Sequence, residues 1–297
     1  MTEKSTAFGH YHPAATFAYF LSVMLVTVFT MNPIVIALSF FGALLFSAAV
    51  ESGREFGSSL LFYLALIAVL SLANPLFSHS GGTPLFFVNG LPITLESFLY
   101  GIDAAVMIAA VLAWSRCMSI VMTSDKVICL FGKFMPKTAL TVSMSLRLIP
   151  LLKRKWREIK DSGTANGMFS ENRISARICD YAALFSALVT WALENAVDTG
   201  ASMRARGYGL RGRSSFNIYV FTAHDFLLLA YTALFSVSAF VFFGVGYIDF
   251  DFYPRLSQVN LSIGAVIFYT AFAFFCIIPS FTEITEDIKW KYFRSKI

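Results

Sequence analysis

Charged residues are scarce in this chain, and long stretches of it carry none. Only 14% of the 297 residues are charged, whereas 57% are hydrophobic and 16% are aromatic. An ordinary soluble domain has about 25% charged residues, so this composition leaves too few polar side chains to cover a water-soluble globule. The scarcity of charge therefore excludes an ordinary soluble protein and indicates that a lipid bilayer is the solvent.

Cysteine is also rare, and its spacing excludes the common metal and redox sites. No Cys-x-x-Cys pair occurs among the four cysteines, which are Cys117, Cys129, Cys179 and Cys276. They fall in membrane or cytoplasmic segments, where we expect free, reduced thiols. His10 and His12 form a His-x-His pair, but two ligands without a third make only a weak metal site. No cofactor and no bound metal are expected.

The motifs of nucleotide hydrolysis and of membrane-embedded catalysis are absent too. A phosphate-binding loop needs a glycine-rich turn followed by Lys and Ser or Thr, and the single Gly-Lys pair, Gly132-Lys133, precedes Phe134. No HExxH or GxSxG sequence occurs, and Asp103 has no second aspartate in its own predicted span to form a paired site. We therefore expect no catalysis. Asp103 either lies near the outer membrane interface, lines a polar path through the membrane or accepts a hydrogen bond from a partner protein.

Several apolar runs have the length of membrane-spanning helices, about 17 to 25 residues. We expect the first run to remain as a span rather than a cleaved signal, because only Lys4 precedes it and the second run follows directly after Asn32-Pro33. The expected fold class is an all-α membrane protein with about six transmembrane helices. Their predicted ranges are 14–30, 33–50, 58–77, 94–120, 223–247 and 259–279.

The basic residues predict how these spans are oriented. Of the 23 Lys and Arg residues, all but Arg255 fall on one predicted side of the membrane. Lys and Arg in short loops are retained on the cytoplasmic side, so both termini are predicted to be cytoplasmic in a multi-pass protein of the cell membrane. The net charge of +5 is thus a signal of topology. It does not indicate nucleic-acid binding.

About one hundred residues separate the fourth and fifth spans, too many for a simple connection. They are predicted to form a cytoplasmic helical domain, with one helix over 137–160 that stops near Gly163 and a second over 174–206. The apolar middle of the second helix is too short for a seventh span. We expect this helix to lie against the inner membrane face or under the bundle.

The chain is therefore divided into four predicted parts. A bundle of four spans comes first and is followed by the cytoplasmic helices, two further spans and a short amphipathic tail suited to surface anchoring. Their ranges are 1–120, 121–221, 222–280 and 281–297.

The most informative motifs lie in the cytoplasmic section. Arg147 and Pro150 belong to an Arg-x-x-Pro helix with the sequence Ser-Leu-Arg-Leu-Ile-Pro-Leu-Leu, before a basic run. Glu194 belongs to Trp-Ala-Leu-Glu-Asn-Ala, which leads into Ser-Met-Arg-Ala-Arg-Gly-Tyr-Gly with Arg204 and Arg206. With a His-Pro pair near the start, this ensemble resembles the transmembrane T component of energy-coupling factor transporters, the family that includes the cobalt-transport permease-like subunits. The resemblance extends over most of the chain.

In that family two cytoplasmic coupling helices each end in Ala-Arg-Gly, and each arginine docks into a groove on one of two ATPase subunits. In the first copy here, asparagine replaces the arginine and lacks its planar, permanently charged fork. The second copy would also be a favourable helix end without any partner, because cations and a following glycine suit a helix C-terminus. The resemblance implies docking at two tips, Ala165-Asn166-Gly167 and Ala205-Arg206-Gly207.

The implied function is a non-catalytic scaffold that couples two cytoplasmic ABC ATPases to a separate substrate-binding S component for uptake of a vitamin or of cobalt or nickel ions. Two alternatives remain open. Glu194-Asn-Ala-x-x-x-Gly200 is similar to the coupling loop of conventional ABC permeases, but Leu210-Arg-Gly-Arg213 stands where that loop continues with Ile-x-Leu-Pro. A membrane enzyme acting on lipid or polyprenyl substrates would use the basic residues for phosphates, yet no aspartate-rich metal motif occurs.

Overall fold

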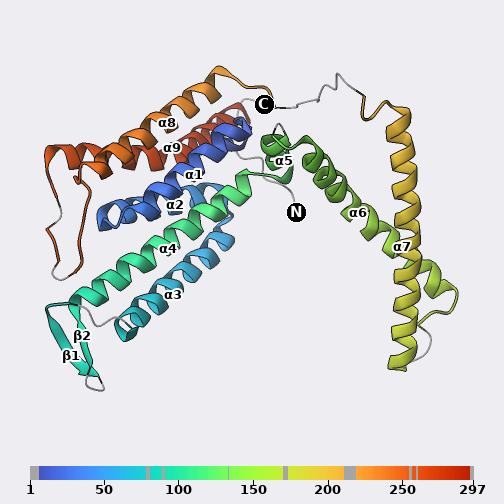
Figure 1. The fold of residues 1–297 in the computed structure, drawn as a ribbon, viewed down its shortest axis with the longest axis horizontal. Coiled ribbons are helices and arrows are strands. Elements are labelled where there is room, and N and C mark those ends of the chain that lie inside the picture. The colour runs from blue at the N-terminus through green and yellow to red at the C-terminus, as the bar shows by residue number, and fades with distance from the viewer. Residues whose placement is uncertain are drawn as a thin grey trace. The chain divides into compact units, whose positions relative to one another are not determined.

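Helices dominate the computed structural model of this chain (Figure 1), which confirms the all-α membrane fold class. The structure describes residues 7–77, 81–88, 91–132, 134–169, 173–210, 219–253, 256–258 and 260–294. The chain divides into two compact units. Unit 1 comprises Met1–Lys126 and Tyr219–Ile297, and unit 2 comprises Val127–Ile218.

Unit 1 is a helical bundle. His12 and Asn32 cap the first two long helices by accepting the backbone N–H two residues ahead, and a proline follows each cap at a position where its missing N–H costs nothing. A short helical turn, η1 (Phe8–His10), precedes them. The long helices are α1 (Pro13–Phe29), α2 (Pro33–Val50), α3 (Gly53–Phe77), α4 (Leu95–Val121), α8 (Ala223–Gly244) and α9 (Ile263–Arg294).

A short antiparallel hairpin of β1 (Pro84–Val88) and β2 (Leu91–Thr94) joins α3 to α4. This hairpin was not expected from the sequence. The hairpin is too small to change the fold class, and it ends at Thr94, whose side chain accepts the backbone N–H of Ser97 and caps α4.

The core of unit 1 is a cluster of aromatic rings. α4 packs against α1, α2 and α3, while α2 also packs against α9 and α1 against α8. The Tyr19 hydroxyl donates a 2.7 Å hydrogen bond to the Phe275 carbonyl, so that α1 and α9 are joined inside the bundle. The large side chains that are completely buried include Phe8, Tyr19, Phe20, Phe46, Trp114 and Phe272.

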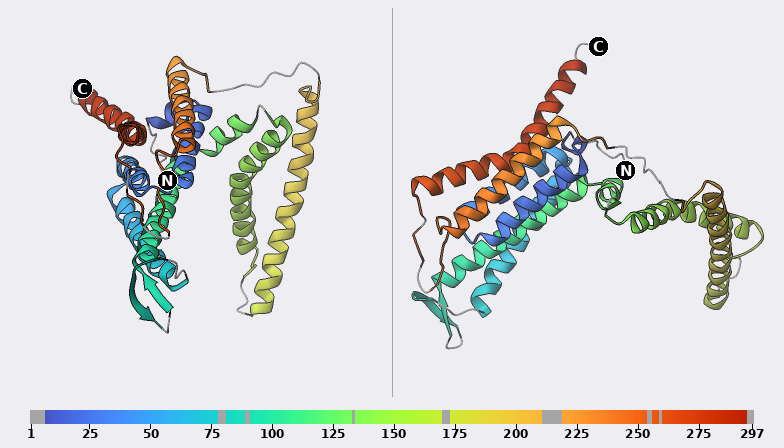
Figure 2. Two further views of the ribbon diagram at one scale, coloured as in Figure 1. Left: turned by 60° about the vertical axis from the view of Figure 1, so that its left-hand side comes forward. Right: turned by 45° about the horizontal axis from the view of Figure 1, so that its top comes forward.

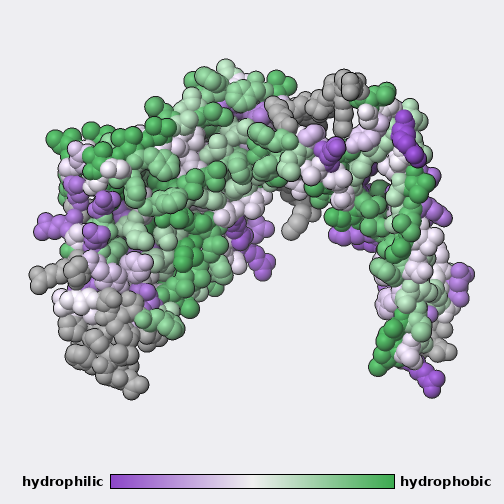
Figure 3. All heavy atoms as spheres, viewed as in Figure 1, coloured by the Kyte–Doolittle hydropathy of each residue, from purple (hydrophilic) through white to green (hydrophobic). Residues whose placement is uncertain are grey.

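The helices long and apolar enough to cross a membrane, among the residues that the structure describes, number six: α2, α3, α4, α8, α9 and one helix of unit 2, Ile174–Ala205. The predicted set had α1 in place of that last helix. α1 has 17 residues, at the lower limit for a span, and nine of them are buried in the bundle. Exposed apolar side chains cover α3 and α8 (Figure 3), as lipid contact requires.

The last span and the tail, predicted as separate elements, are one continuous helix. α9 runs from Ile263 to Arg294 through Pro279. Proline ends most helices in water because it removes one backbone hydrogen bond and crowds the preceding turn. In a membrane helix, neighbouring helices and local adjustment make up for the lost bond, so the helix continues.

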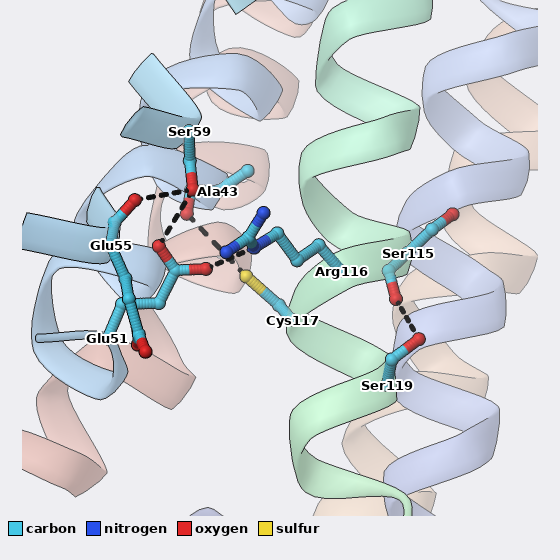
Figure 4. Close-up of polar contacts among 8 residues, drawn as sticks. All are labelled: Ala43, Glu51, Glu55, Ser59, Ser115, Arg116, Cys117 and Ser119. Carbon is cyan, nitrogen blue, oxygen red and sulfur yellow. Dashed lines mark hydrogen bonds and ion pairs between the residues drawn. The ribbon is translucent and has the colours of Figure 1, made fainter. Parts of the chain in front are cut away.

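Glu51 joins three helices at the turn between α2 and α3 (Figure 4). Its carboxylate forms an ion pair with Arg116 of α4 and accepts a 3.1 Å hydrogen bond from the Ser59 hydroxyl of α3. The Glu51 side chain is only 2% exposed, whereas that of Arg116 is 48% exposed. The arginine therefore neutralises a carboxylate that has almost no contact with solvent.

This unequal burial predicts unequal effects of neutralising the two partners. Arg116→Gln leaves a buried anion and should lower the free energy of unfolding by about 2 kcal/mol, less than the full cost of a broken buried pair because this one is partly exposed. Glu51→Gln should cost about 1 kcal/mol or less, because Arg116 already reaches solvent. Thermal or denaturant unfolding in detergent measures both values. A larger loss for Glu51→Gln would contradict this account.

Candidate functional site: two helix tips in unit 2

Unit 2 is built on two long helices, α6 (Pro136–Ala165) and α7 (Ile174–Ala205), preceded by α5 (Ser124–Gly132), whose first residues belong to unit 1. α6 ends at Ala165, two residues beyond the stop predicted near Gly163. Gly163 is helical and buried, with the Met168 sulfur close to its α-carbon. A glycine inside a helix weakens it without ending it; a glycine that turns left-handed ends it.

Aromatic contacts hold α6 against α7. The rings of Trp156 and Tyr181 are parallel, with their centroids 6.5 Å apart. The Lys155 ammonium lies 5.9 Å from the centre of the Trp191 ring, a cation–π contact. Leu184 of α7 is almost completely buried beside them. These contacts give the two helices one defined crossing.

The first tip ends α6 in a Schellman motif. Gly167 has a left-handed φ of +85° and its N–H donates to the Thr164 carbonyl at 3.1 Å. The Met168 N–H donates to the Gly163 carbonyl at 2.9 Å. These two bonds satisfy carbonyls that a helix end leaves unpaired, and they place Asn166 at the C-cap.

The second tip repeats this geometry at the end of α7. Gly207 has a φ of +77° and donates to the Arg204 carbonyl, and the Tyr208 N–H donates to the Met203 carbonyl, both at 3.0 Å. Arg206 is the C-cap residue. The two Ala-x-Gly motifs predicted from the sequence are therefore two copies of one backbone structure. They differ in the side chain that the cap presents.

Both cap side chains are exposed. Asn166 and Arg206 point from turns whose preceding residues, Ala165 and Ala205, are also exposed and too small to cover them. Within the described part of the chain, neither the Asn166 amide nor the Arg206 guanidinium has a hydrogen-bond or ion-pair partner. Arg204 is exposed beside Arg206 in the last turn. The second tip therefore presents free cationic donors.

The two tips lie far apart along α7 (Figure 2). The first is fastened near the start of α7, because the Phe169 N–H donates to the Asp180 carboxylate at 3.0 Å and the Phe169 and Tyr181 ring centroids are 5.0 Å apart. The second tip begins at Ala205, which is twenty-five residues after Asp180 in the same helix. At 1.5 Å per residue this is about 38 Å along the helix.

Asp180 was missed in the sequence analysis. The only carboxylate in the first half of α7 was the available signal. Its partner, however, is a backbone N–H eleven residues away, in a turn whose geometry the sequence did not reveal. Phe169 has a positive φ of +65°, which is unusual for a residue other than glycine. The Asp180 bond and the Tyr181 ring hold it in this conformation.

The other predicted site residues are not gathered at the tips. Arg147 and Pro150 are exposed in the interior of α6, more than three turns before its end. Glu194 is exposed on α7, three turns before Arg206, and Gly200 lies inside the same helix. The basic residues Arg211 and Arg213 fall outside the described residues.

His10 and His12, judged too few to bind a metal, lie in unit 1, where His12 makes local contacts. The His12 N–H donates to the Asp225 carboxylate at 2.6 Å, and its ring Nδ1 accepts the Ala14 N–H at 3.2 Å. Within the described ranges, no three His, Cys, Asp or Glu side chains are placed to hold a metal ion. Asp103, whose position was left open, is a buried residue of α4.

Two comparisons with known proteins bear on this site. The family model CbiQ, described as cobalt transport protein, matches residues 5–218. The chain is also 27% identical over 220 residues to the energy-coupling factor transporter transmembrane protein EcfT of Lactobacillus helveticus (strain DPC 4571), covering 68% of this chain and 78% of that protein. The family match includes α1 to α7 and both tips, and it ends before α8.

The tip geometry predicts opposite effects of alanine at two glycines of α7. Gly207→Ala forces a side chain into left-handed backbone and should cost about 1 to 2 kcal/mol at the helix end. Gly200→Ala is the matched control: it lies inside the helix with open space around its α-carbon, and should stabilise α7 by about 1 kcal/mol. Amide hydrogen exchange of the last turns of α7 measures both. Equal effects would rule out the left-handed cap.

Proposed function

This chain belongs to the cobalt transport protein (CbiQ) family, and on that premise we propose that it is the transmembrane coupling subunit of an ATP-driven importer of the energy-coupling factor type. It is a non-catalytic scaffold. Two cytoplasmic ABC ATPases dock on the tips of α6 and α7, and a separate S component in the membrane binds the substrate, a vitamin or a cobalt or nickel ion. The name of the Lactobacillus helveticus relative supports the transporter class.

The observation that carries the proposal is the repetition of one tip structure at two distant places. Two exposed Schellman caps about 38 Å apart along one helix suit two separate docking grooves better than one. Each motif also stabilises the end of its own helix, so it is the exposed cap side chain at each end that supports docking. The duplicated geometry supports a pair of ATPases, each engaged by one tip, whose relative movement α6 and α7 transmit.

The two tips are expected to dock with unequal strength. The Arg206 guanidinium offers a planar fork of donors that can bind a carboxylate through two charge-assisted hydrogen bonds. Asn166 offers neutral hydrogen bonds only. The scaffold is therefore asymmetric, with its stronger contact at the end of α7.

An uncovered apolar face on α7 supports a membrane-embedded partner. Residues spaced by four, seven or eight along this helix are between 61% and 78% exposed, and they form one face. Apolar area of this size requires cover from lipid or from another membrane protein. We assign it to the S component and the adjoining bilayer. The residues are Ile174, Ile178, Phe185, Leu193 and Val197.

A conventional permease is the less favoured alternative. Its coupling loop would need a turn at Gly200, whereas α7 continues through this residue for another turn and a half. No observation on the described residues favours an enzyme that acts on lipids.

The asymmetry of the tips makes a direct prediction. Arg206→Ala should weaken ATPase docking by about 2 to 5 kcal/mol, because it leaves a partner carboxylate unpaired in a partly desolvated groove, and transport should collapse. Asn166→Ala should cost only about 0.5 to 1.5 kcal/mol. Asn166→Arg should strengthen the first tip. Co-purification of the ATPases and substrate uptake measure all three.

Arg173→Ala is the control for a general loss of charge, since Arg173 is exposed at the opposite end of α7. All variants must reach the membrane in normal amounts; losing a helix-end charge costs only about 0.3 to 1 kcal/mol and should not prevent this. Full assembly and uptake with Arg206→Ala would mean that Arg206 is only a helix cap.

The proposed orientation has its own test. Cysteines introduced at Gly82 and Ser257 should react with an impermeant thiol reagent from outside the cell, whereas those at Ser170 and Ser214, outside the described residues, should not. The test also decides whether α7 crosses the membrane. A crossing by α7 would expose Ser214 outside and hide Ser257, the reverse of the expected labelling.

A further inference from the structure

One exposed side of α6 changes from apolar to basic along the helix. Three large apolar side chains in its first half are between 37% and 49% exposed. They are spaced by four and three residues, so they lie on one face of the helix. No other large apolar side chain of α6, all of whose residues the structure describes, is exposed to this degree. The three residues are Val142, Leu146 and Ile149.

Cations continue this face into the second half of the helix. Lys153 follows Ile149 by four residues, and Arg157 and Lys160 follow at intervals of four and three. All three cations are exposed. At 100° per residue, Lys153 and Lys160 lie within about 15° of the mean direction of the apolar side chains, and Arg157 lies about 55° from it. The apolar row and these cations therefore form one surface, which we call the α6 face.

The cations of the α6 face are not neutralised by the chain itself. Within the described residues, none of the three has a hydrogen-bond or ion-pair partner. The two carboxylates of α6 lie further round the helix, Asp161 about 95° and Glu158 about 155° from the mean apolar direction. Glu158 is paired with Lys155, which does not belong to the α6 face. The α6 face is thus positively charged.

A membrane surface is the cover that suits both parts of the α6 face. Apolar side chains of an interfacial helix enter the boundary between acyl chains and headgroups, while the long stems of Lys and Arg carry their charges to lipid phosphates. Clusters of cations on amphipathic helices are attracted to anionic lipids. An acidic groove on a soluble protein would match the cations but not the apolar row. In the chain, α6 follows the membrane helix α4 after fourteen residues, so a bilayer surface is within its reach.

We infer that the α6 face docks on anionic lipid headgroups. The apolar row of its first half enters the interface of the bilayer, and Lys153, Arg157 and Lys160 bind lipid phosphates. The contact holds α6 along the membrane surface. The inference concerns one face of unit 2 and does not depend on the proposed ATPase partners.

The test compares two sides of α6. The full chain, with Cys129→Ser and Cys179→Ser, carries one fluorescent thiol label, either at Ile149→Cys on the α6 face or at Arg147→Cys, about 160° round the helix. The remaining Cys117 and Cys276 are buried. The chain is reconstituted without partners in phosphatidylcholine vesicles with or without phosphatidylglycerol. Quenching is measured with iodide on both sides of the membrane and with lipids carrying a headgroup nitroxide.

In vesicles with phosphatidylglycerol, the label at 149 should lose most of its iodide quenching and gain nitroxide quenching, while the label at 147 stays open to iodide. High salt should weaken this difference, because exposed charges are screened.

A matched pair of variants, each carrying the label at 149, tests the cations. K153Q/K160Q should remove most of the protection, because each cation near an anionic surface contributes about a five-fold preference for it. R147Q/R154Q removes the same charge from the other side of α6 and should keep most of the protection. K153R/K160R should retain it.

Equal iodide quenching at 147 and 149 would overturn the inference. So would protection at 149 that is independent of phosphatidylglycerol, or that K153Q/K160Q and R147Q/R154Q reduce equally. Protection that appears only when ATPases are added would assign the α6 face to a protein partner instead. Protection that depends on protein concentration in detergent without lipid would assign it to a second copy of the chain.

Discussion

The constraint on which this structure depends is that backbone polar groups inside a bilayer have to find their partners within the protein. Helices meet this requirement along their length but leave unpaired groups at both ends. The ends are accordingly where polar side chains concentrate. His12, Asn32 and Thr94 cap helices of unit 1, and Thr222 forms a reciprocal capping box with Asp225.

One end of unit 1 is held together by the segment before α1. The Phe8 N–H donates to Glu283 of α9, and the Phe8 ring is buried among aromatic rings of the core. The Lys126 ammonium donates to the Gly9 carbonyl at 2.6 Å. The His12 N–H binds Asp225 at the start of α8. Lys126 and Tyr219 bound unit 2 in the chain, so the same short segment secures unit 1 near both connections to unit 2.

The proposed function uses helix ends in the opposite way. At the tips of unit 2, backbone N–H groups pair with the last helix carbonyls through the Schellman bonds. The cap side chain is therefore available to a partner. The cost of presenting Arg206 is therefore small, because the helix end is stable without it. Because backbone hydrogen bonds stabilise the helix end, asparagine at the first tip leaves the fold unchanged. It alters only the strength of the proposed contact.

Much of this could be predicted from the sequence, because it depends on local physics. Composition and the length of apolar runs indicated a helical membrane protein. Five of the six predicted spans, all in unit 1, correspond to helices that are long and apolar enough to cross a membrane. The Ala-x-Gly motifs marked both tips, since a glycine that turns left-handed ends a helix whatever surrounds it. The end of α6 shows the limit: Gly163 stays helical and Gly167 is the glycine that turns left-handed, a choice that depends on the residues around each glycine.

Only the tertiary structure decided which residues meet across the chain. The pairing of Glu51 with Arg116, the bond between Phe169 and Asp180, and the separation of the tips along α7 follow from how helices cross. Helix crossing depends on the shapes of many side chains at once, such as the stacked Trp156 and Tyr181 rings, and no single spacing in the sequence encodes it. The continuity of α9 through Pro279 was decided in the same way, because a proline ends a helix or not according to its surroundings.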